Sequence, residues 1–475
     1  MNMHPAALIP ELALVAGAVL GLLLGSWLPR HHQWPVRLLA ALACLVGLAA
    51  TAAAMGSPAR MVFGGSYAVD TATNAGRIIV LAATLLTLCL SIETVDSHHR
   101  ETEFHVLMLL AALGTIVLTG ASDLLLLVAG YLLASIPLYA LAGFFKDAPG
   151  TEASLKYYLM GALLGVTMLA GVTILYGVGR STGYATLAQN LPAAPRAAVA
   201  VGLVVVLAGL LFKIGAVPAH FWVPDVTEGA SIPVAAFVTT VPKIGGLIAV
   251  YRLVAEALPG VAVNWPLLPA ILAAASMTLG NLAAFFQDTV RRLLAYSTIS
   301  QVGYLLIAAV VATRSEIALP SLLFYLAAYA VTNLGAFAVV AELPGASRLA
   351  DYRGLARRHP GLAAVLVVCL LGLVGTPPTA VFLGKLEIFS AAIDGGATWL
   401  AVVAVVNTVA SLFYYLRWIA PAFLRPAPEQ ETDTDVLAPA GRWSALAAYT
   451  AGAASLALGV VGGVVLPLGM GPLLP

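Results

Sequence analysis

The sequence predicts an all-α polytopic membrane protein. Hydrophobic residues make up 61% of its 475 residues and charged residues only 9%, whereas soluble domains carry about 25% charged residues. The apolar residues form long runs, and about 20 apolar residues suffice for one helical crossing of a bilayer. By that measure we expect about fourteen transmembrane helices in a lipid bilayer.

The expected spans follow one another with short connections and no soluble domain between them. The first run follows an uncharged start, MNMHP, so we expect a retained span and not a cleaved signal. The longest connection, 417–443, carries an acidic run at 429–435 that is typical of a solvated loop. In chain order the spans cover residues 6–28, 37–55, 76–93, 104–120, 123–144, 156–177, 198–221, 232–255, 265–286, 293–312, 319–341, 361–395, 399–420 and 444–466.

Two of these spans contain residues that interrupt helices. The seventh contains Gly215 and Pro218, and the twelfth, which is too long for one straight crossing, contains Gly375, Pro377 and Pro378. Such residues are tolerated at membrane depth where protein or a water-filled cavity satisfies the freed backbone groups. Transporters place their ion sites at helix breaks of this kind. We therefore expect two broken helices.

Three lysines, Lys213, Lys243 and Lys385, are the only cations that we expect inside the spans. A lysine in hydrocarbon costs roughly 3 kcal/mol and by default indicates a functional site. Arginine keeps its proton, whereas a desolvated lysine can lose it. A series of lysines at mid-membrane therefore suits a proton relay. The alternative is that each is a structural lysine whose ammonium extends to the interface.

The remaining lysines and arginines predict the orientation. Fourteen of them lie after odd-numbered spans and six, Arg77 and Arg252 included, lie in loops after even-numbered spans. Cytoplasmic loops carry the excess of cations, so we expect both termini on the periplasmic side. A net charge of +1 argues against a nucleic-acid partner.

Two further residues are candidates for the proton path. His220 lies seven residues after Lys213, which is two helical turns if the helix continues. Its side chain titrates near neutrality, so it either carries protons or caps the broken helix. Lys156, four residues after Glu152, either feeds the path or stabilises the start of a helix.

Polar residues between and within the spans have two interpretations as well. Asp225 and Glu228, in the loop expected between the two lysine-bearing spans, either take up protons or are simply solvated. Asn407, Ser411 and Tyr414 share one face of the thirteenth span, and the stretch 296–301 is polar too. These residues either line a water path near Lys385 or bond neighbouring helices to one another.

The sequence offers no residues for redox chemistry or metal binding. It contains no Gly-rich dinucleotide turn and no paired histidines at haem-ligand positions. The cysteines, Cys44, Cys89 and Cys369, stand singly in apolar runs, without ligand spacing. We therefore expect no cofactor in this chain.

Several stretches resemble the N subunit of bacterial complex I, a proton-translocating NADH:quinone oxidoreductase. The resemblance covers about residues 100–420. In sibling subunits and in multisubunit cation/proton antiporters, the stretch after the first lysine typically resembles PxHxWLPDAxxxxP, and the form here is N-type. The stretches are EASLKYYLMGA (152–162), FKIGAVPAHFWVPDVTEGASIPVAAFVTTVPKIGG (212–246), RRLLAYSTISQVGY (291–304), TNLGAFAV (332–339) and FLGKLEIF (382–389).

The resemblance implies a fold with two inverted five-helix repeats, each containing a broken helix. It divides the chain into three N-terminal helices (1–100), a first repeat (101–256), a second repeat (257–420), and a cytoplasmic loop with a last helix (421–475). It implies that Lys213, Lys243 and Lys385 relay protons in a bacterial inner membrane. NADH, FMN, iron–sulfur clusters and quinone would then belong to partner subunits, and M-, K- and J-type subunits would be the membrane neighbours.

One position departs from the family pattern. The family resembles GLELLSIPLY in the fifth span, with a glutamate that pairs with the lysine of the seventh, whereas this chain reads GYLLASIPLY with Leu132 at that position. Two alternatives remain: a subunit of a cation/proton antiporter or membrane-bound hydrogenase, and a structural subunit that does not pump. The N-type motif weighs against the antiporter, and the three lysines weigh against the purely structural role.

Overall fold

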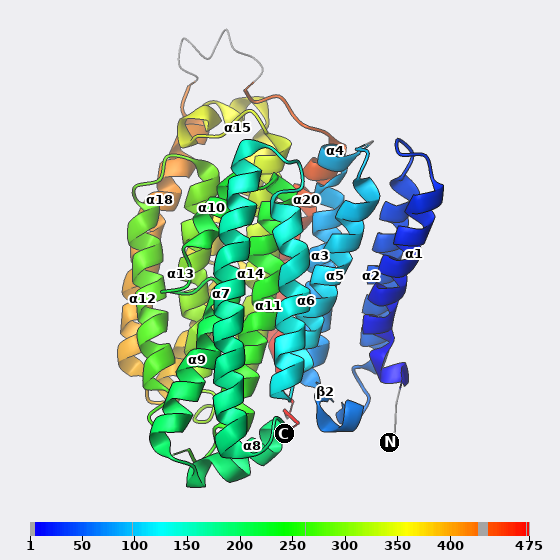
Figure 1. Cartoon of the computed structure of the whole chain (residues 1–475). Helices are drawn as coiled ribbons and strands as arrows, with labels where there is room; N and C mark the ends of the chain where they lie inside the picture. The colour runs from blue at the N-terminus through cyan, green and yellow to red at the C-terminus, as the bar shows by residue number, and fades with distance from the viewer. Residues whose placement is uncertain (1–4, 97, 262, 426–435, 472, 475) are drawn as a thin grey trace.

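Thirteen helices in the described part of the chain are long and apolar enough to cross a membrane. The computed structural model describes residues 5–96, 98–261, 263–425, 436–471 and 473–474. The acidic run at 429–435, expected in a solvated loop, therefore lies outside the described residues. The long helices stand side by side in one bundle, and α1 begins and α20 ends at the same end of it (Figure 1).

The long helices coincide with the expected spans, the twelfth of which consists of two shorter helices, and four short helices lie between the spans. In chain order they are α1 (Ile9–Trp27), α2 (Trp34–Ala54), α3 (Thr71–Leu90), α4 (Ile92–Val95), α5 (Glu101–Gly120), α6 (Leu124–Ala142), α7 (Ala148–Gly179), α8 (Tyr184–Asn190), α9 (Arg196–Ile214), α10 (Trp222–Gly229), α11 (Ile232–Ala257), α12 (Leu267–Ala284), α13 (Val290–Val310), α14 (Ala318–Glu342), α15 (Leu355–Arg358), α16 (Pro360–Val374), α17 (Ala380–Asp394), α18 (Thr398–Phe423) and α20 (Arg442–Val465). A small antiparallel hairpin joins α2 to α3 and consists of β1 (Arg60–Val62) and β2 (Tyr67–Val69).

Both expected breaks are present. α9 ends at Ile214, and α16 and α17 together occupy the twelfth span with a gap between Val374 and Ala380. Gly215 and Gly375 follow the first half-helix at each break with φ of 73° and 93°, a left-handed conformation that favours glycine. The glycines predicted to interrupt these helices therefore do so by ending them.

The segment after the first break differs from expectation. Residues 222–229, which we expected in a loop, form the short helix α10. Asp225 in its first turn is favourably placed near the positive end of the helix dipole. Because α9 does not continue beyond Ile214, His220 does not lie two helical turns beyond Lys213, as a continuous helix would require.

The centre of the bundle is built from α11, α13 and α14, which are buried along almost their whole length. In Figure 1 they stand between α12 and α18 on one side and α1 and α2 on the other. α1 and α2 expose large apolar side chains such as Leu12, Val19 and Leu42, as expected where helices face lipid or a partner. The polar residues described below lie mainly on the central helices.

The expectation that only lysines lie inside the spans is wrong. Arg77 lies within α3 and Arg252 within α11, and both are buried. Arg77 forms a bidentate pair with Glu11, in which Nε and Nη2 each donate a 2.8 Å hydrogen bond to one carboxylate oxygen. Nη2 of Arg252 donates to both carboxylate oxygens of Asp70 at 2.8 Å. A buried guanidinium is tolerated because a hydrogen-bonded carboxylate compensates its charge.

Candidate functional site

Lys213 and Lys243 lie next to each other at the first break. Lys213 is the penultimate residue of α9, and the ammonium of Lys243 on α11 donates a 2.8 Å hydrogen bond to the carbonyl of Ile214, the last residue of α9. Gly246 permits this close packing, since a Cβ there would lie 2.6 Å from Cγ2 of Ile214. Two lysines that are thirty residues apart in sequence are thus brought to the same end of α9.

The Lys213 ammonium is held by groups of α6. It donates hydrogen bonds to the carbonyl of Ala134 at 2.6 Å and to the hydroxyl of Ser135 at 2.9 Å. The ring centroid of Tyr131 lies 5.8 Å away. Leu132, the position of the family's glutamate, is 41% exposed at the outside of the isolated chain. A hydroxyl and a carbonyl therefore bind the ammonium where the family pattern suggests a carboxylate.

Lys385 repeats this arrangement at the second break. Its ammonium donates to the carbonyls of Leu373 at 3.2 Å and Val374 at 2.8 Å, the last two residues of α16. It also lies 4.2 Å from the ring centroid of Tyr304. The last carbonyls of a helix have no partner within it and form the negative end of its dipole. At both breaks a lysine ammonium satisfies such carbonyls.

None of the ion pairs among the described residues includes Lys213, Lys243 or Lys385, although each is at most 3% exposed. Burying an ammonium costs several kcal/mol, and hydrogen bonds to neutral groups offset part of that cost. Because no carboxylate fixes the charge, the protonation state of each lysine depends on the dipoles and charges that surround it.

A series of polar groups runs between the two breaks. The Tyr329 hydroxyl lies 2.8 Å from the carbonyl of Thr239, which is one turn from Lys243 on α11, and 3.1 Å from the hydroxyl of Thr298. One turn farther along α13, the Gln301 amide donates a 2.7 Å hydrogen bond to the Leu373 carbonyl. Lys385 binds that same carbonyl. Hydroxyl and amide groups therefore lie between the two lysine sites in the centre of the bundle.

Sequence reasoning missed part of this series. Thr298 and Gln301 belong to the polar stretch that we singled out, but Tyr325, Tyr329 and Asn333 of α14 were not singled out. The Tyr325 hydroxyl donates to Gln301 at 2.5 Å, and the Asn333 amide donates to Thr240 at 2.8 Å. Their four-residue spacing places them on one face of α14, and that spacing was the available signal.

Asn407 and Tyr414 bond neighbouring helices. Asn281 of α12 donates to the carbonyl and the side-chain oxygen of Asn407 at 2.8 and 3.0 Å, and the Tyr414 hydroxyl donates to Asn281 at 3.0 Å. Asn407 and Tyr414 of the thirteenth span therefore form hydrogen bonds to a neighbouring helix, which is one of the two interpretations of this polar face.

His220 and Lys156 lie apart from these ammonium contacts. His220 lies in the first break, where its backbone carbonyl accepts a hydrogen bond from Val223, and its buried Nδ1 has no partner among the described residues. Lys156 on α7 is held by Asp225 at 2.9 Å and Glu152 at 2.8 Å. The pair with Asp225 ties α10 to α7, so Lys156 fixes the helix that follows the first break.

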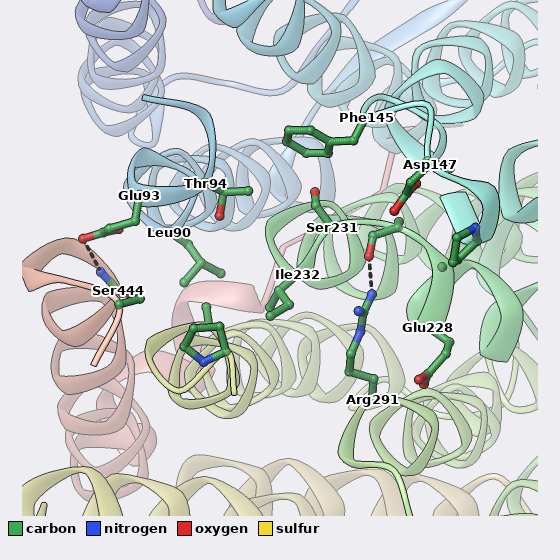
Figure 2. A pocket seen from close by; sticks show the side chains of 17 residues that line it. Leu90, Glu93, Thr94, Phe145, Asp147, Glu228, Ser231, Ile232, Arg291 and Ser444 are labelled. Atoms are coloured by element: carbon green, nitrogen blue, oxygen red, sulfur yellow. Dashed lines mark hydrogen bonds between the residues drawn. The ribbon is translucent and has the colours of Figure 1, made fainter. Parts of the chain in front are cut away.

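A cavity of about 530 Å³ lies where several helices begin or end near the start of α11. Figure 2 shows Asp147 and Glu228 near Arg291 on one side of it, and Glu93 with Ser444 on the other. Glu228 accepts a hydrogen bond from Thr289 at 3.2 Å. Ile232, the first residue of α11, lines the cavity, about 17 Å along the helix axis from Lys243 at 1.5 Å per residue.

Among the residues that the structure describes, no group of three or more His, Cys, Asp or Glu side chains is arranged to hold a metal ion. The three cysteines are free thiols. The lysine sites themselves contain amines, a hydroxyl and backbone carbonyls.

Comparisons with known proteins agree with the fold. Residues 121–411 match the family described as NADH:quinone oxidoreductase/Mrp antiporter, transmembrane. A chain of respiratory complex I from Thermus thermophilus with bound aureothin is 34% identical with a TM-score of 0.84, and the match covers 98% of this chain and 100% of that one. A chain of the Mrp complex from Dietzia sp. reaches a TM-score of 0.82 at 23% identity over 98% and 97% of the two chains, which shows a common fold. These matches define an antiporter-like membrane protein.

NADH-quinone oxidoreductase subunit N 1 of Streptomyces griseus subsp. griseus is 58% identical over 466 residues, which are 98% of each chain. The chain belongs to the subunit N family of NADH-quinone oxidoreductase, as the resemblance of its motifs suggested. It is a multi-pass membrane subunit of that enzyme complex.

Proposed function

We propose that this chain translocates protons across the bacterial inner membrane as one unit of NADH:quinone oxidoreductase. Lys213, Lys243 and Lys385 are the groups that take up and release the proton. The observation that carries the proposal is their common setting: each lysine is buried in a membrane helix and hydrogen-bonded to neutral groups only. An ammonium in such a setting can give up its proton when its surroundings change.

Lys243 is the central relay in this proposal. Lys213 is its cytoplasm-side neighbour in the relay, and the contact of Lys243 with Ile214, the residue after Lys213, supports their proximity. Lys385 is the link toward the outer side or the next subunit, and the series through Tyr329, Thr298 and Gln301 supports its coupling to Lys243. Lys156 positions α10 at this site, and His220 is a further group that exchanges protons at the first break.

Quinone reduction elsewhere in the complex supplies the driving force. It changes the conformation or the electrostatic potential around the lysines, and a change of about 1.4 kcal/mol alters a protonation equilibrium tenfold. NADH, FMN, iron–sulfur clusters and quinone are bound by partner subunits, and this chain carries no redox step. Its membrane neighbours are M-, K- and J-type subunits.

The cavity beside Arg291 is the place where protons enter from the cytoplasm. It lies at the start of α11, the helix that carries Lys243. The excess of cations in the loops after odd-numbered spans supports a cytoplasmic location of that end and periplasmic termini. In this arrangement residues 101–256 and 257–420 are two inverted repeats, and the glycine-terminated break in each supports that division.

A second candidate is a subunit that keeps the fold but does not pump. The neutral environment of Lys213 favours it, since its ammonium binds the Ala134 carbonyl and the Ser135 hydroxyl and no carboxylate among the described residues. In that case Lys213 would be a structural donor between α9 and α6.

A tagged form of this chain, extracted gently from its native membrane, tests the proposal. The proposal predicts that flavin and iron–sulfur subunits co-purify with NADH-driven quinone reduction, and that vesicles containing the complex acidify when NADH is added. If antiporter or hydrogenase subunits co-purified and flavin and iron–sulfur subunits did not, the assignment to NADH-driven quinone reduction would be contradicted. Identical acidification by wild-type complex and by a complex with all three lysines replaced by methionine would favour the non-pumping role.

A further inference from the structure

The turn between α13 and α14 carries charged groups that lie apart from the lysine sites. Residues 312–316 of this turn line a cavity of about 500 Å³. Arg314 and Glu316 are exposed there, and none of the ion pairs among the described residues includes either of them. The cavity therefore offers a guanidinium and a carboxylate to a ligand from outside the chain.

Ser315 adds a buried hydroxyl to the same cavity. It is 6% exposed, and its Oγ has no hydrogen-bond partner among the described residues. α14 begins three residues later, without a side-chain cap. The first N–H groups of a helix have no partner within it and favour an anion. Arg314, Ser315 and the start of α14 thus supply the hydrogen-bond donors that a phosphate group accepts.

An apolar groove lies between α3, α14 and the last helix, α20. Its volume is about 360 Å³, and all the residues that line it are apolar. It follows α14 from Pro320 to Leu334, which is about 21 Å at 1.5 Å per residue. One leaflet of a bilayer has roughly 15 Å of hydrocarbon. Ile78, Ala327 and Val331 in the wall of the groove are half-buried, so the groove faces the surroundings of the chain.

The cavity and the groove adjoin at two places along the chain. At the start of α14, Leu319 lines the cavity and Pro320 lines the groove. Near the C-terminus, Gly469 lines the groove and Gly471 lines the cavity. A ligand with a polar head and an apolar tail can therefore occupy both.

A single hydrocarbon chain fits the groove better than water or a helix. A volume of 360 Å³ over about 21 Å gives a mean cross-section of about 17 Å², whereas a helix about 10 Å across needs about 79 Å². An apolar cavity does not hold water stably, and protein interiors are otherwise close-packed. The surrounding bilayer supplies acyl chains that are both thin and apolar.

We propose that the cavity and the groove together bind one zwitterionic phospholipid with an ammonium headgroup. Its phosphate accepts hydrogen bonds from Arg314, Ser315 and the start of α14, its ammonium pairs with Glu316, and one acyl chain lies in the groove. Arg314 and Glu316 are the charged residues among those that line the cavity. A headgroup with both charges is therefore favoured over one with a net negative charge, which would meet the carboxylate unpaired. The site does not depend on proton translocation by this chain.

Photolabelling of the intact complex is the first test. The complex is placed in phosphatidylcholine vesicles with a trace of phosphatidylethanolamine that carries a diazirine in one acyl chain, and labelled peptides are identified by mass spectrometry. The ammonium of phosphatidylcholine has no N–H to donate to Glu316. The proposal predicts labels on residues 75–83 of α3 and 320–334 of α14. Equal or stronger labelling of these residues by the matching phosphatidylglycerol would overturn the proposal.

Two single substitutions test the headgroup and the acyl chain separately. Arg314→Gln removes the charged partner of the phosphate and is expected to lower labelling at a fixed lipid concentration about tenfold. Ala327→Phe fills the groove and is expected to abolish labelling of α14. Arg314 is exposed, so its replacement leaves the fold intact, and unchanged labelling in Arg314→Gln would overturn the headgroup site by itself.

Each substitution has a matched control. Arg196 is exposed at the start of α9 and Ala170 is exposed on α7, and neither lines the cavity or the groove. Arg196→Gln and Ala170→Phe should therefore be labelled like the wild type. An equal loss of labelling in these controls would show that no specific site is involved.

A map of the complex in native lipid provides an independent check. The proposal predicts elongated density in the groove that continues to Arg314. An empty groove, or one filled by a segment of a partner subunit, would contradict the lipid site whatever the complex pumps.

Discussion

The ammonium of Lys243 donates a 2.8 Å hydrogen bond to the carbonyl of Ile214, the residue at which α9 ends. The sequence places these residues on different helices, and the break after Ile214 is what frees the carbonyl. Lys385 makes the same kind of contact with Val374, at the end of α16. In both halves of the chain, therefore, a helix break and a buried lysine form one structural unit.

Substitution of Gly215, the glycine at the first break, tests whether the helix break and the buried lysine depend on each other. Gly215→Ala places a Cβ at a φ of 73°, 2.7 Å from Cγ2 of Val223 and 2.9 Å from Nζ of Lys243. Strain of this kind costs about 1–3 kcal/mol. We expect a lower thermal midpoint of the purified complex and lower pumping per NADH oxidised.

Gly177→Ala in α7 is the control, because a Cβ there meets nothing within 4 Å and φ is not positive. Alanine is the better helix former by about 1 kcal/mol, so this variant should be as stable as the wild type or slightly more so. Equal stability of the two variants would show that the break does not depend on Gly215.

Ser135 provides the side-chain oxygen that binds the Lys213 ammonium. Ser135→Ala removes a 2.9 Å hydrogen bond to a charged group, worth about 1.5–3 kcal/mol. A loss of 1.4 kcal/mol corresponds to about a tenfold change in rate, so pumping measured in vesicles should fall by about that factor while the complex still assembles.

Ser390→Ala is the matched control for Ser135. Ser390 is exposed on α17 and, among the described residues, its hydroxyl bonds only to the Leu386 carbonyl of its own helix. Its loss should therefore leave pumping unchanged. Normal pumping by Ser135→Ala would mean that the hydroxyl does not replace the missing carboxylate functionally.

The ion pair between Arg252 and Asp70 provides a test of stability. Asp70→Asn keeps a side-chain oxygen that can accept the capping hydrogen bond from the Thr73 amide at the start of α3. It removes the negative charge of Asp70, so Glu256 is then the carboxylate that still pairs with Arg252. Breaking a buried pair costs about 3–5 kcal/mol, and Glu256 should keep the cost near the lower limit. The amount of this subunit in assembled complex and its thermal midpoint should both fall.

An exposed ion pair serves for comparison. Asp96 is 57% exposed in its pair with Arg37, so Asp96→Asn should change stability by only about 0–1 kcal/mol. If Asp70→Asn were equally mild, the buried pair would contribute nothing specific to the fold.

The fold was largely predictable because membrane helices are determined by local composition. Runs of about 20 apolar residues locate the spans, and Gly215 and Gly375 mark the two breaks because their positive φ ends a helix. Arg77 and Arg252 were misplaced because positions near span ends look like loops in sequence. Their partners, Glu11 and Asp70, lie far away in the chain.

The burial of the three lysines could be predicted from their position inside apolar runs, but their contacts could not. Their acceptors are mostly backbone carbonyls, such as those of Ile214 and Val374, and a backbone carbonyl has no signature in a sequence. Tyr329 and Asn333 were missed because polar residues spaced by four within a span are as often interhelical contacts. Only the packing of α14 against α11 and α13 shows which groups they meet.

Replacement of Lys243 by methionine in the intact complex tests the central claim most directly. The measurement is the number of protons moved into vesicles per NADH oxidised, alongside quinone reduction in uncoupled vesicles. The account predicts assembled complex with clearly fewer protons per NADH, because the central amine is gone. An assembled complex with an unchanged proton yield would contradict the lysine relay.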